Sequence, residues 1–158
     1  MNSFLTNLVA NERRTATLER VETPGAALTL TRSATLAITT AGTTITWQTE
    51  TRNRNFVWSG TDITIPTSGY YVMNLFYTAN LSHTTFMRLI VNGVTTGFFS
   101  SSALASSTQG FSVMRYLVTG DVLRVQALPS VNVTIAVNAE NTGGESPILH
   151  IAQITGAI

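Results

Sequence analysis

Gly-Tyr-Tyr-Val-Met-Asn-Leu-Phe-Tyr, residues 69–77, is the stretch that decides the fold. Its aromatic and β-branched residues follow the turn formed by residues 66–69, so they indicate a β-strand. Side chains alternate between the two faces of a strand. One face carries Tyr71, Met73, Leu75 and Tyr77, and the other carries Tyr70, Val72, Asn74 and Phe76. Both sets are mostly apolar, which predicts that both faces are covered. The chain's own core can cover one face, and what covers the other bears on function.

Composition narrows the class of protein. A chain of 158 residues is long enough for one domain with a buried core. Charged residues make up 11%, against about 25% in typical soluble domains. With a net charge of +1 and nine basic residues that are all arginine, nucleic acid is not an expected partner. Cysteine is absent, so disulfides and thiolate metal sites are excluded. We expect neither a secretion signal nor a membrane span at the N-terminus.

Residues 1–22 contain the only pattern typical of a helix. Phe4, Leu5, Leu8 and Val9 fall on one face at helical spacing. A helix this short is marginal alone in water and needs a surface to dock on. Two readings stay open: a frayed tail, or an attachment arm, helical or extended, whose apolar face packs on another protein. We assign residues 1–33 to this arm and 34–158 to a second, folded domain.

The rest of the chain alternates apolar residues with threonine and predicts about ten short strands. Asn92-Gly93 is a strong hairpin signal. The segments Ser100–Gly110 and Arg52–Asn55 are predicted to be exposed loops, the first of them mobile. Ile148–Ile154 is apolar on both faces, like residues 69–77, so we expect these two strands to be neighbours or to share a sheet. The pattern indicates an all-β sandwich or jelly roll.

Three short motifs, in order, resemble the C1q/TNF-like jelly-roll family. A strand ends at Pro66 and the next opens with Gly69 and two tyrosines, a later strand ends in Asn92-Gly93, and a hairpin follows at Gly120-Asp121. The resemblance covers residue 34 to the C-terminus. It implies a ten-stranded jelly roll that assembles as a homotrimer around a three-fold axis.

The resemblance also implies which residues lie between subunits. The outward face of the central strand approaches the axis in the family, which assigns Tyr70, Val72 and Phe76 to the trimer interface. The strand of the Gly-Asp hairpin adds Met114 and Tyr116. Arg115 departs from the pattern, because an apolar interior residue is expected at its position, and this puts the register of that strand in question.

The sequence offers little for catalysis or for cofactors. His83, expected in a loop, and His150, expected in the last strand with the trimer axis as one possible surrounding, are the only histidines, and neither has a sequence partner typical of a nucleophile or an orienting acid. The only aspartates, Asp62 and Asp121, are separate turn residues, so no metal site is predicted. We therefore expect no catalytic, cofactor-binding or metal-binding residues.

Three functional hypotheses follow. The first is a virion surface protein, most simply a bacteriophage capsid decoration or cement trimer. Its arm of about 22 residues would span roughly 33 Å as a helix and bind a capsid or other virion protein.

The second is a receptor-binding knob of a tail or head fibre, whose loops Ser100–Gly110 and Arg52–Asn55 contact a host surface glycan or protein. The third, a carbohydrate-active enzyme, is disfavoured by the lack of paired carboxylates. No membrane partner is expected.

Overall fold

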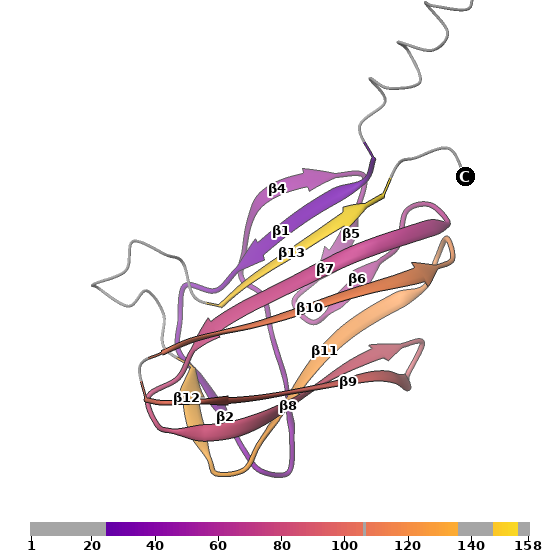
Figure 1. Cartoon of the computed structure of the whole chain (residues 1–158). Coiled ribbons are helices and arrows are strands. Elements are labelled where there is room, and N and C mark those ends of the chain that lie inside the picture. The colour runs from indigo at the N-terminus through magenta and orange to yellow at the C-terminus, as the bar shows by residue number, and fades with distance from the viewer. Residues whose placement is uncertain (1–24, 106, 136–146, 155–158) are drawn as a thin grey trace, which may run out of the picture.

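A computed structural model describes residues 25–105, 107–135 and 147–154 of the chain. These residues form a sandwich of two large antiparallel sheets and a small two-stranded sheet (Figure 1). The strands are β1 (Ala27–Thr31), β2 (Leu36–Ile38), β3 (Thr43–Thr44), β4 (Thr49–Arg54), β5 (Val57–Ser59), β6 (Asp62–Thr64), β7 (Gly69–Thr78), β8 (His83–Val91), β9 (Val94–Ala103), β10 (Thr108–Leu117), β11 (Val122–Pro129), β12 (Val133–Ile135) and β13 (Ile148–Gln153). No helix able to cross a membrane occurs in the described part of the chain.

The five-stranded sheet has the order β10-β7-β13-β1-β4, and the six-stranded sheet has the order β5-β6-β11-β8-β9, with β3 pairing β11 at one end of that strand. The fold is therefore all-β, as predicted. The two strands with two apolar faces do share a sheet: β13 pairs directly with β7, from Ile148 opposite Phe76 to Gln153 opposite Tyr71.

The hydrophobic core lies between the two large sheets. Leu28 and Leu30 from β1, Leu149 and Ile151 from β13, and the inward residues of β7 and β11 are buried in it. β1 lies within the first 33 residues, which the sequence assigned to the arm. Its pairing with β4 and β13 means that the sandwich begins earlier in the chain than residue 34.

Both segments predicted to be loops contain strand. Residues 100–103 end β9 and residues 108–110 begin β10, so only a short turn separates two long edge strands. Similarly, Arg52–Arg54 belongs to β4, and the turn comes at Asn55, whose φ is +71°. Both predictions were wrong for the same reason. These are exposed edge segments, where polar and small side chains hide the alternation that marks a half-buried strand.

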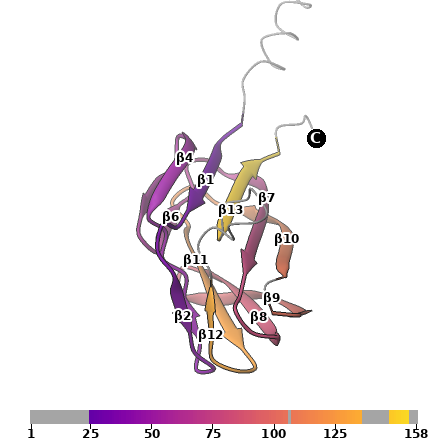
Figure 2. The ribbon, with the colours of Figure 1, turned by 90° about the vertical axis from the view of Figure 1, so that its left-hand side faces the viewer.

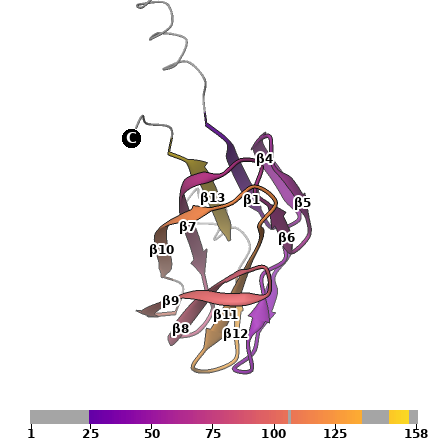
Figure 3. The same cartoon turned by 90° about the vertical axis from the view of Figure 1, so that its right-hand side faces the viewer.

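The two ends of the sandwich differ in what they present. β1 begins and β13 ends at the same end of the molecule, where the backbone N–H of Gln153 donates to the Ala26 carbonyl at 2.8 Å (Figures 2 and 3). The other end, which we call the distal pole, carries residues 80–82, 104–105 and 130–132. The Ala105 N–H there donates to Ser82 Oγ at 3.0 Å. The predicted helical arm, with Phe4, Leu5, Leu8 and Val9, lies outside the described residues.

Candidate assembly interface

Side chains of β7 alternate between the core and the surface, as the sequence predicts. Tyr71, Met73, Leu75 and Tyr77 are buried, each 5% exposed or less. On the opposite face Tyr70 is 42% exposed and Phe76 is 40% exposed, while Val72 and Asn74 are half-buried. Within one copy of the chain, two aromatic rings on the outward face of a central strand therefore remain open to water.

β10 extends this outward face. Its ladder with β7 places Met114 opposite Val72 and Tyr116 opposite Tyr70. The Tyr70 and Tyr116 rings meet edge to face, with centroids 5.3 Å apart and planes at 75°, a favourable geometry for aromatic pairs. Met114 is 63% exposed and Tyr116 is 53% exposed. The structure thus brings all five residues predicted for the subunit interface, on β7 and β10, onto one surface.

β13 adds residues that sequence reasoning did not assign to this surface. Ile148, His150 and Ala152 lie opposite Phe76, Asn74 and Val72, respectively, and so share the outward side. The signal was present, because residues 148–154 are apolar on both faces, but only the pairing shows which of them extend the patch. The surface formed by the outward residues of these three strands is called the assembly face below. It comprises Tyr70, Val72, Asn74, Phe76, Gly110, Ser112, Met114, Tyr116, Ile148, His150 and Ala152.

Gly110 leaves room for the Phe76 ring on the assembly face. It lies opposite Phe76 in the β7–β10 ladder. A Cβ atom at position 110 would lie 2.9 Å from Phe76 Cε1, closer than real contacts allow. The Phe76 ring therefore lies over Gly110 of β10, and the absence of a side chain at position 110 leaves room for it there.

The assembly face contains no Asp, Glu, Lys or Arg. The outward face of the six-stranded sheet is different. There Arg124 forms an ion pair with Asp62, with one N–O distance of 2.8 Å, and Arg88 donates to Gln126 at 3.4 Å. The Arg124 guanidinium lowers the pKa of the Asp62 carboxyl, chiefly through its hydrogen bond. The six-stranded sheet thus pairs these outward charged groups within the chain, whereas the assembly face presents uncharged aromatic rings.

A row of polar residues crosses the assembly face. Ser112, Asn74, His150 and Thr29 are successive partners on β10, β7, β13 and β1. Thr29 Oγ1 lies 3.1 Å from His150 Nδ1. Within the described part of the chain, the Asn74 amide and His150 Nε2 have no hydrogen-bond partner. This row, called the polar rung below, lies between the apolar pair Phe76 and Ile148 and the Met114, Val72 and Ala152 group.

Arg115 points inward, as the alternation of side chains along β10 requires, and the pairing of β10 with β7 runs without a register shift. It is half-buried near the edge of the sandwich, and its Nη1 donates to the Thr96 carbonyl of β9 at 2.8 Å. The guanidinium thus bridges the edge strands of the two sheets, which explains how an arginine occupies a position where an apolar residue was expected.

His83 is the first residue of β8, not part of a loop, and it is buried in a hydrogen-bonded cluster. Tyr77 Oη donates to Gln109 Oε1 at 2.9 Å, and Gln109 Nε2 lies 3.1 Å from His83 Nε2. The Leu81 carbonyl lies 2.7 Å from His83 Nδ1, and a carbonyl only accepts, so Nδ1 carries the proton. Burial raises the pKa of Tyr77 to about 12. The cluster ties β7, β8 and β10 together.

No metal site is found in the described part of the chain, where no three His, Cys, Asp or Glu side chains gather. Asp121 instead accepts from the Val118 N–H and from Asn92 Nδ2, each at 2.8 Å, and so fixes two turns. Asp62 is held by Arg124. Both aspartates thus have structural partners.

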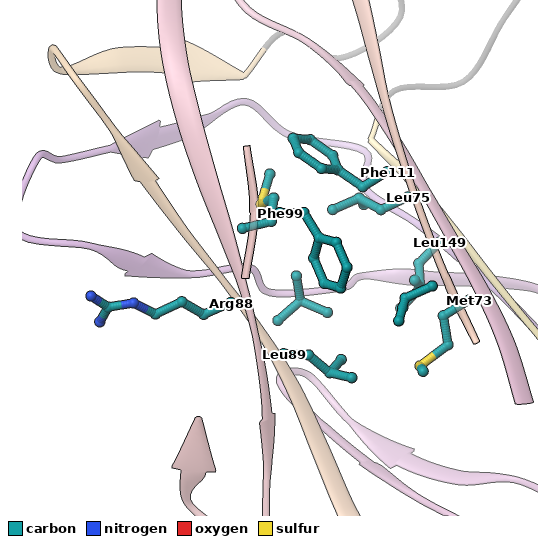
Figure 4. Close-up of a pocket in the computed structure, with 10 residues that line it drawn as sticks. Met73, Leu75, Arg88, Leu89, Phe99, Phe111 and Leu149 are labelled. Carbon is teal, nitrogen blue, oxygen red and sulfur yellow. The ribbon is translucent and has the colours of Figure 1, made fainter. Parts of the chain in front are cut away.

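An apolar cavity of about 30 Å³ lies between the sheets. Met73, Leu75, Phe99 and Phe111 line it, and the Arg88 guanidinium points away from it (Figure 4). This volume is about that of one water molecule in the liquid, and the lining offers no polar partners, so the cavity is a packing defect of the core and not a ligand site.

Comparison with solved structures places the fold. Murine APRIL at pH 8.5 superposes with a TM-score of 0.61 at 14% identity, covering 82% of this chain and 98% of that one. The globular domain of zebrafish complement 1qA gives 0.55 at 12% identity, covering 82% and 97%. Eiger TNF from S. frugiperda gives 0.58 at 10% identity, covering 85% and 96%. The fold is the TNF/C1q-like jelly roll. No family model and no curated protein matches the sequence.

Proposed function

We propose that this chain is a non-enzymatic binding and structural module that assembles as a homotrimer through the assembly face. The observation that carries the proposal is the cluster of exposed aromatic side chains on β7 and β10: Tyr70 and Phe76, with Tyr116 and Met114 beside them. Tyr, Phe and Met are enriched at interfaces, and charged residues are depleted from interface centres. An exposed apolar patch of this kind marks an interaction site.

A second copy of the same chain is the occupant that fits best. The assembly face is uncharged, so its partner needs no compensating charge. Its polar groups, the Asn74 amide, the His150 imidazole and the tyrosine hydroxyls, each donate and accept hydrogen bonds, so each can pair with its own kind. The resemblance to C1q/TNF-like jelly rolls favours three copies.

The assembly is tested by the mass of the purified full-length chain. Light scattering coupled to size exclusion at pH 7.5 should give about 3 × 17.0 = 51.0 kDa. A single species of 17.0 kDa at micromolar concentration would exclude self-association through this face.

We further propose that the trimer decorates the surface of a virus particle, most simply a bacteriophage capsid, and is anchored by residues 1–22. The arrangement of the sandwich supports this: β1 starts at one end, beside the end of β13, and the distal pole lies at the other. An anchor that precedes β1 would leave the distal pole facing outward. The low charge and the threonine-rich surface suit a repeated, neutral coat.

Deletion of residues 1–22 separates anchoring from assembly. The truncated chain should keep the trimer mass and the β-rich circular dichroism spectrum but fail to sediment with particles. Alanine at Phe4 and Leu8 together should give the same loss. If the truncated protein still coats particles, the arm is not the anchor.

The alternative is a receptor-binding knob, and one feature of the distal pole favours it. Leu81 is 48%, Leu104 is 76% and Val131 is 44% exposed, on three neighbouring turns. These apolar tips, and not the strand residues of Arg52–Asn55, are the contact points that the structure offers to a host glycan or protein. Serine at Leu81 and Leu104 should then abolish cell attachment while particles stay intact, whereas a decoration protein should tolerate both changes.

A further inference from the structure

The polar rung carries an inference that rests on the proposed assembly and goes beyond it. A fully apolar assembly face would hold together at any pH. The rung places a histidine on that face, on its border strand β13, between Asn74 of β7 and Thr29 of β1. His150 is half-buried before any partner binds. A second copy laid on this face would remove it further from water.

Among the described residues, the positions that face His150 across β7 and β1 carry no carboxylate. On β7 the facing residue is Asn74, flanked by Val72 and Phe76, and on β1 it is Thr29, whose hydroxyl lies 3.1 Å from Nδ1. Beyond Thr29, β4 places Arg52 at the next position of the same row. Arg54 follows on the same side of β4, whereas the bulge between Thr29 and Leu30 places Glu50 opposite the inward Leu30, where Glu50 accepts from Asn53 Nδ2 at 2.8 Å.

We propose that His150 makes association through the assembly face pH-dependent, so that copies associate at neutral pH and separate near pH 5. Imidazole is the ordinary side chain that gains a charge between pH 8 and pH 5. A neutral His150 can donate or accept at Nε2 and so pair with Asn74 or His150 of another copy. A protonated His150 would bring a cation into an apolar contact, and a symmetric assembly would bring one from each subunit.

The size of the effect follows from linkage. We expect full protonation of His150 to weaken each subunit's contribution to association about tenfold. For three subunits the dissociation constant of the trimer would then rise by up to about 10³-fold. For a trimer in equilibrium with three separate copies, this raises the protein concentration at half-dissociation about 30-fold, the square root of 10³.

The test compares the full-length native chain with His150→Gln at constant ionic strength from pH 7.5 to pH 5.0. The native mass should fall from 51.0 kDa toward 17.0 kDa, three copies against one, while His150→Gln keeps its mass at pH 5.0. His150→Arg should already be dissociated at pH 7.5. Far-UV circular dichroism of the native chain at pH 5.0 should be unchanged, which distinguishes separation of copies from unfolding.

NMR gives a second readout that does not depend on an arginine variant folding. Titration of the His150 imidazole should show a lower protonation midpoint in the native assembly than in Phe76→Asn, which opens the face without adding a charge beside His150. A trimer whose mass holds to pH 5.0, or a mass that falls equally in His150→Gln, would overturn the role of His150 and leave the assembly standing. A single-copy native chain at pH 7.5 would overturn both.

Discussion

The two faces of β7 carry similar side chains, but one face is buried in the core and the other is partly exposed. Inward, Tyr71 and Leu75 are covered by the other sheet, and the Tyr77 hydroxyl is satisfied within the chain by Gln109. On the outward face, Tyr70 and Phe76 are also large aromatic residues, but they are flanked only by residues of the neighbouring strands β10 and β13. The difference shows that apolar character alone does not make a core. A strand in a central position can stabilise the fold with one face and present the other to a partner.

The largest contrast between these faces should appear in unfolding free energy. Leu75→Ala, which opens a space beside the existing core cavity, should cost about 2–5 kcal/mol. Val72→Ala, one side chain removed from the outward face, should cost less than about 1 kcal/mol in a dissociated background. Urea unfolding of both variants in a Phe76→Asp background gives the comparison. Equal losses would mean that the outward face is packed within one copy after all.

The inward tyrosine should also make stability depend on alkaline pH. Because burial raises the pKa of Tyr77 to about 12, while an unfolded tyrosine titrates near 10, its contribution is fully present below pH 10. It is lost progressively above that pH, by roughly 2–3 kcal/mol on reaching pH 12. Tyr77→Phe should flatten this decline, and the matched outward variant Tyr70→Phe should not. The measurement is urea unfolding between pH 9 and pH 12.

A smaller effect is expected where the outward ring is seated. Gly110→Val would place a Cβ atom 2.9 Å from Phe76 Cε1, so the ring must lift from the sheet. We expect the dissociation constant of the assembly to rise about tenfold, or ~1.4 kcal/mol, with little change in monomer stability. Sedimentation equilibrium measures the first quantity. An unchanged dissociation constant would show that the placement of this ring does not matter for association.

The smallest effect concerns the inner side of the same sheet. Filling the apolar cavity of about 30 Å³ with one methyl group, by Val113→Ile, should stabilise the fold by at most ~0.7 kcal/mol. The midpoint of thermal unfolding should rise slightly, and the trimer mass should stay the same. A loss of stability would mean that the cavity is already closed by side-chain motion.

The sequence predicted which side chains of β7 point inward, because side chains alternate between the two faces of a strand. Once one residue is assigned to a face, all the others follow. The pairing of β7 with β13 was expected as one of two possibilities, since both strands are apolar on both sides. β4 and the turn between β9 and β10 were missed, because exposed edge residues such as Arg52 and Ser102 carry no alternation. The strand order, and with it the polar rung, depends on contacts between distant parts of the chain that no local pattern encodes.

The N-terminal arm shows a different limit of prediction from sequence. Its apolar residues Phe4 and Leu8 predict a docking helix by spacing alone, and a short helix takes its stability from whatever it packs against. The partner is not in the sequence, so neither is the docked conformation. Residues 27–31 were assigned to the arm for a related reason, because the place of β1 in the sandwich is defined by β4 and β13, far along the chain.

A matched pair of substitutions tests the central claim most directly. Phe76 on the five-stranded sheet is 40% exposed, and Phe86 on the outward face of the six-stranded sheet is 48% exposed, so one copy of the chain tolerates a charge at either site. Light scattering at pH 7.5 should give 17.0 kDa for Phe76→Asp, because association would bury the carboxylate at a cost of several kcal/mol. Phe86→Asp should keep the native mass of about 51.0 kDa, three copies. A Phe76→Asp protein that stays trimeric would contradict the assignment of this face.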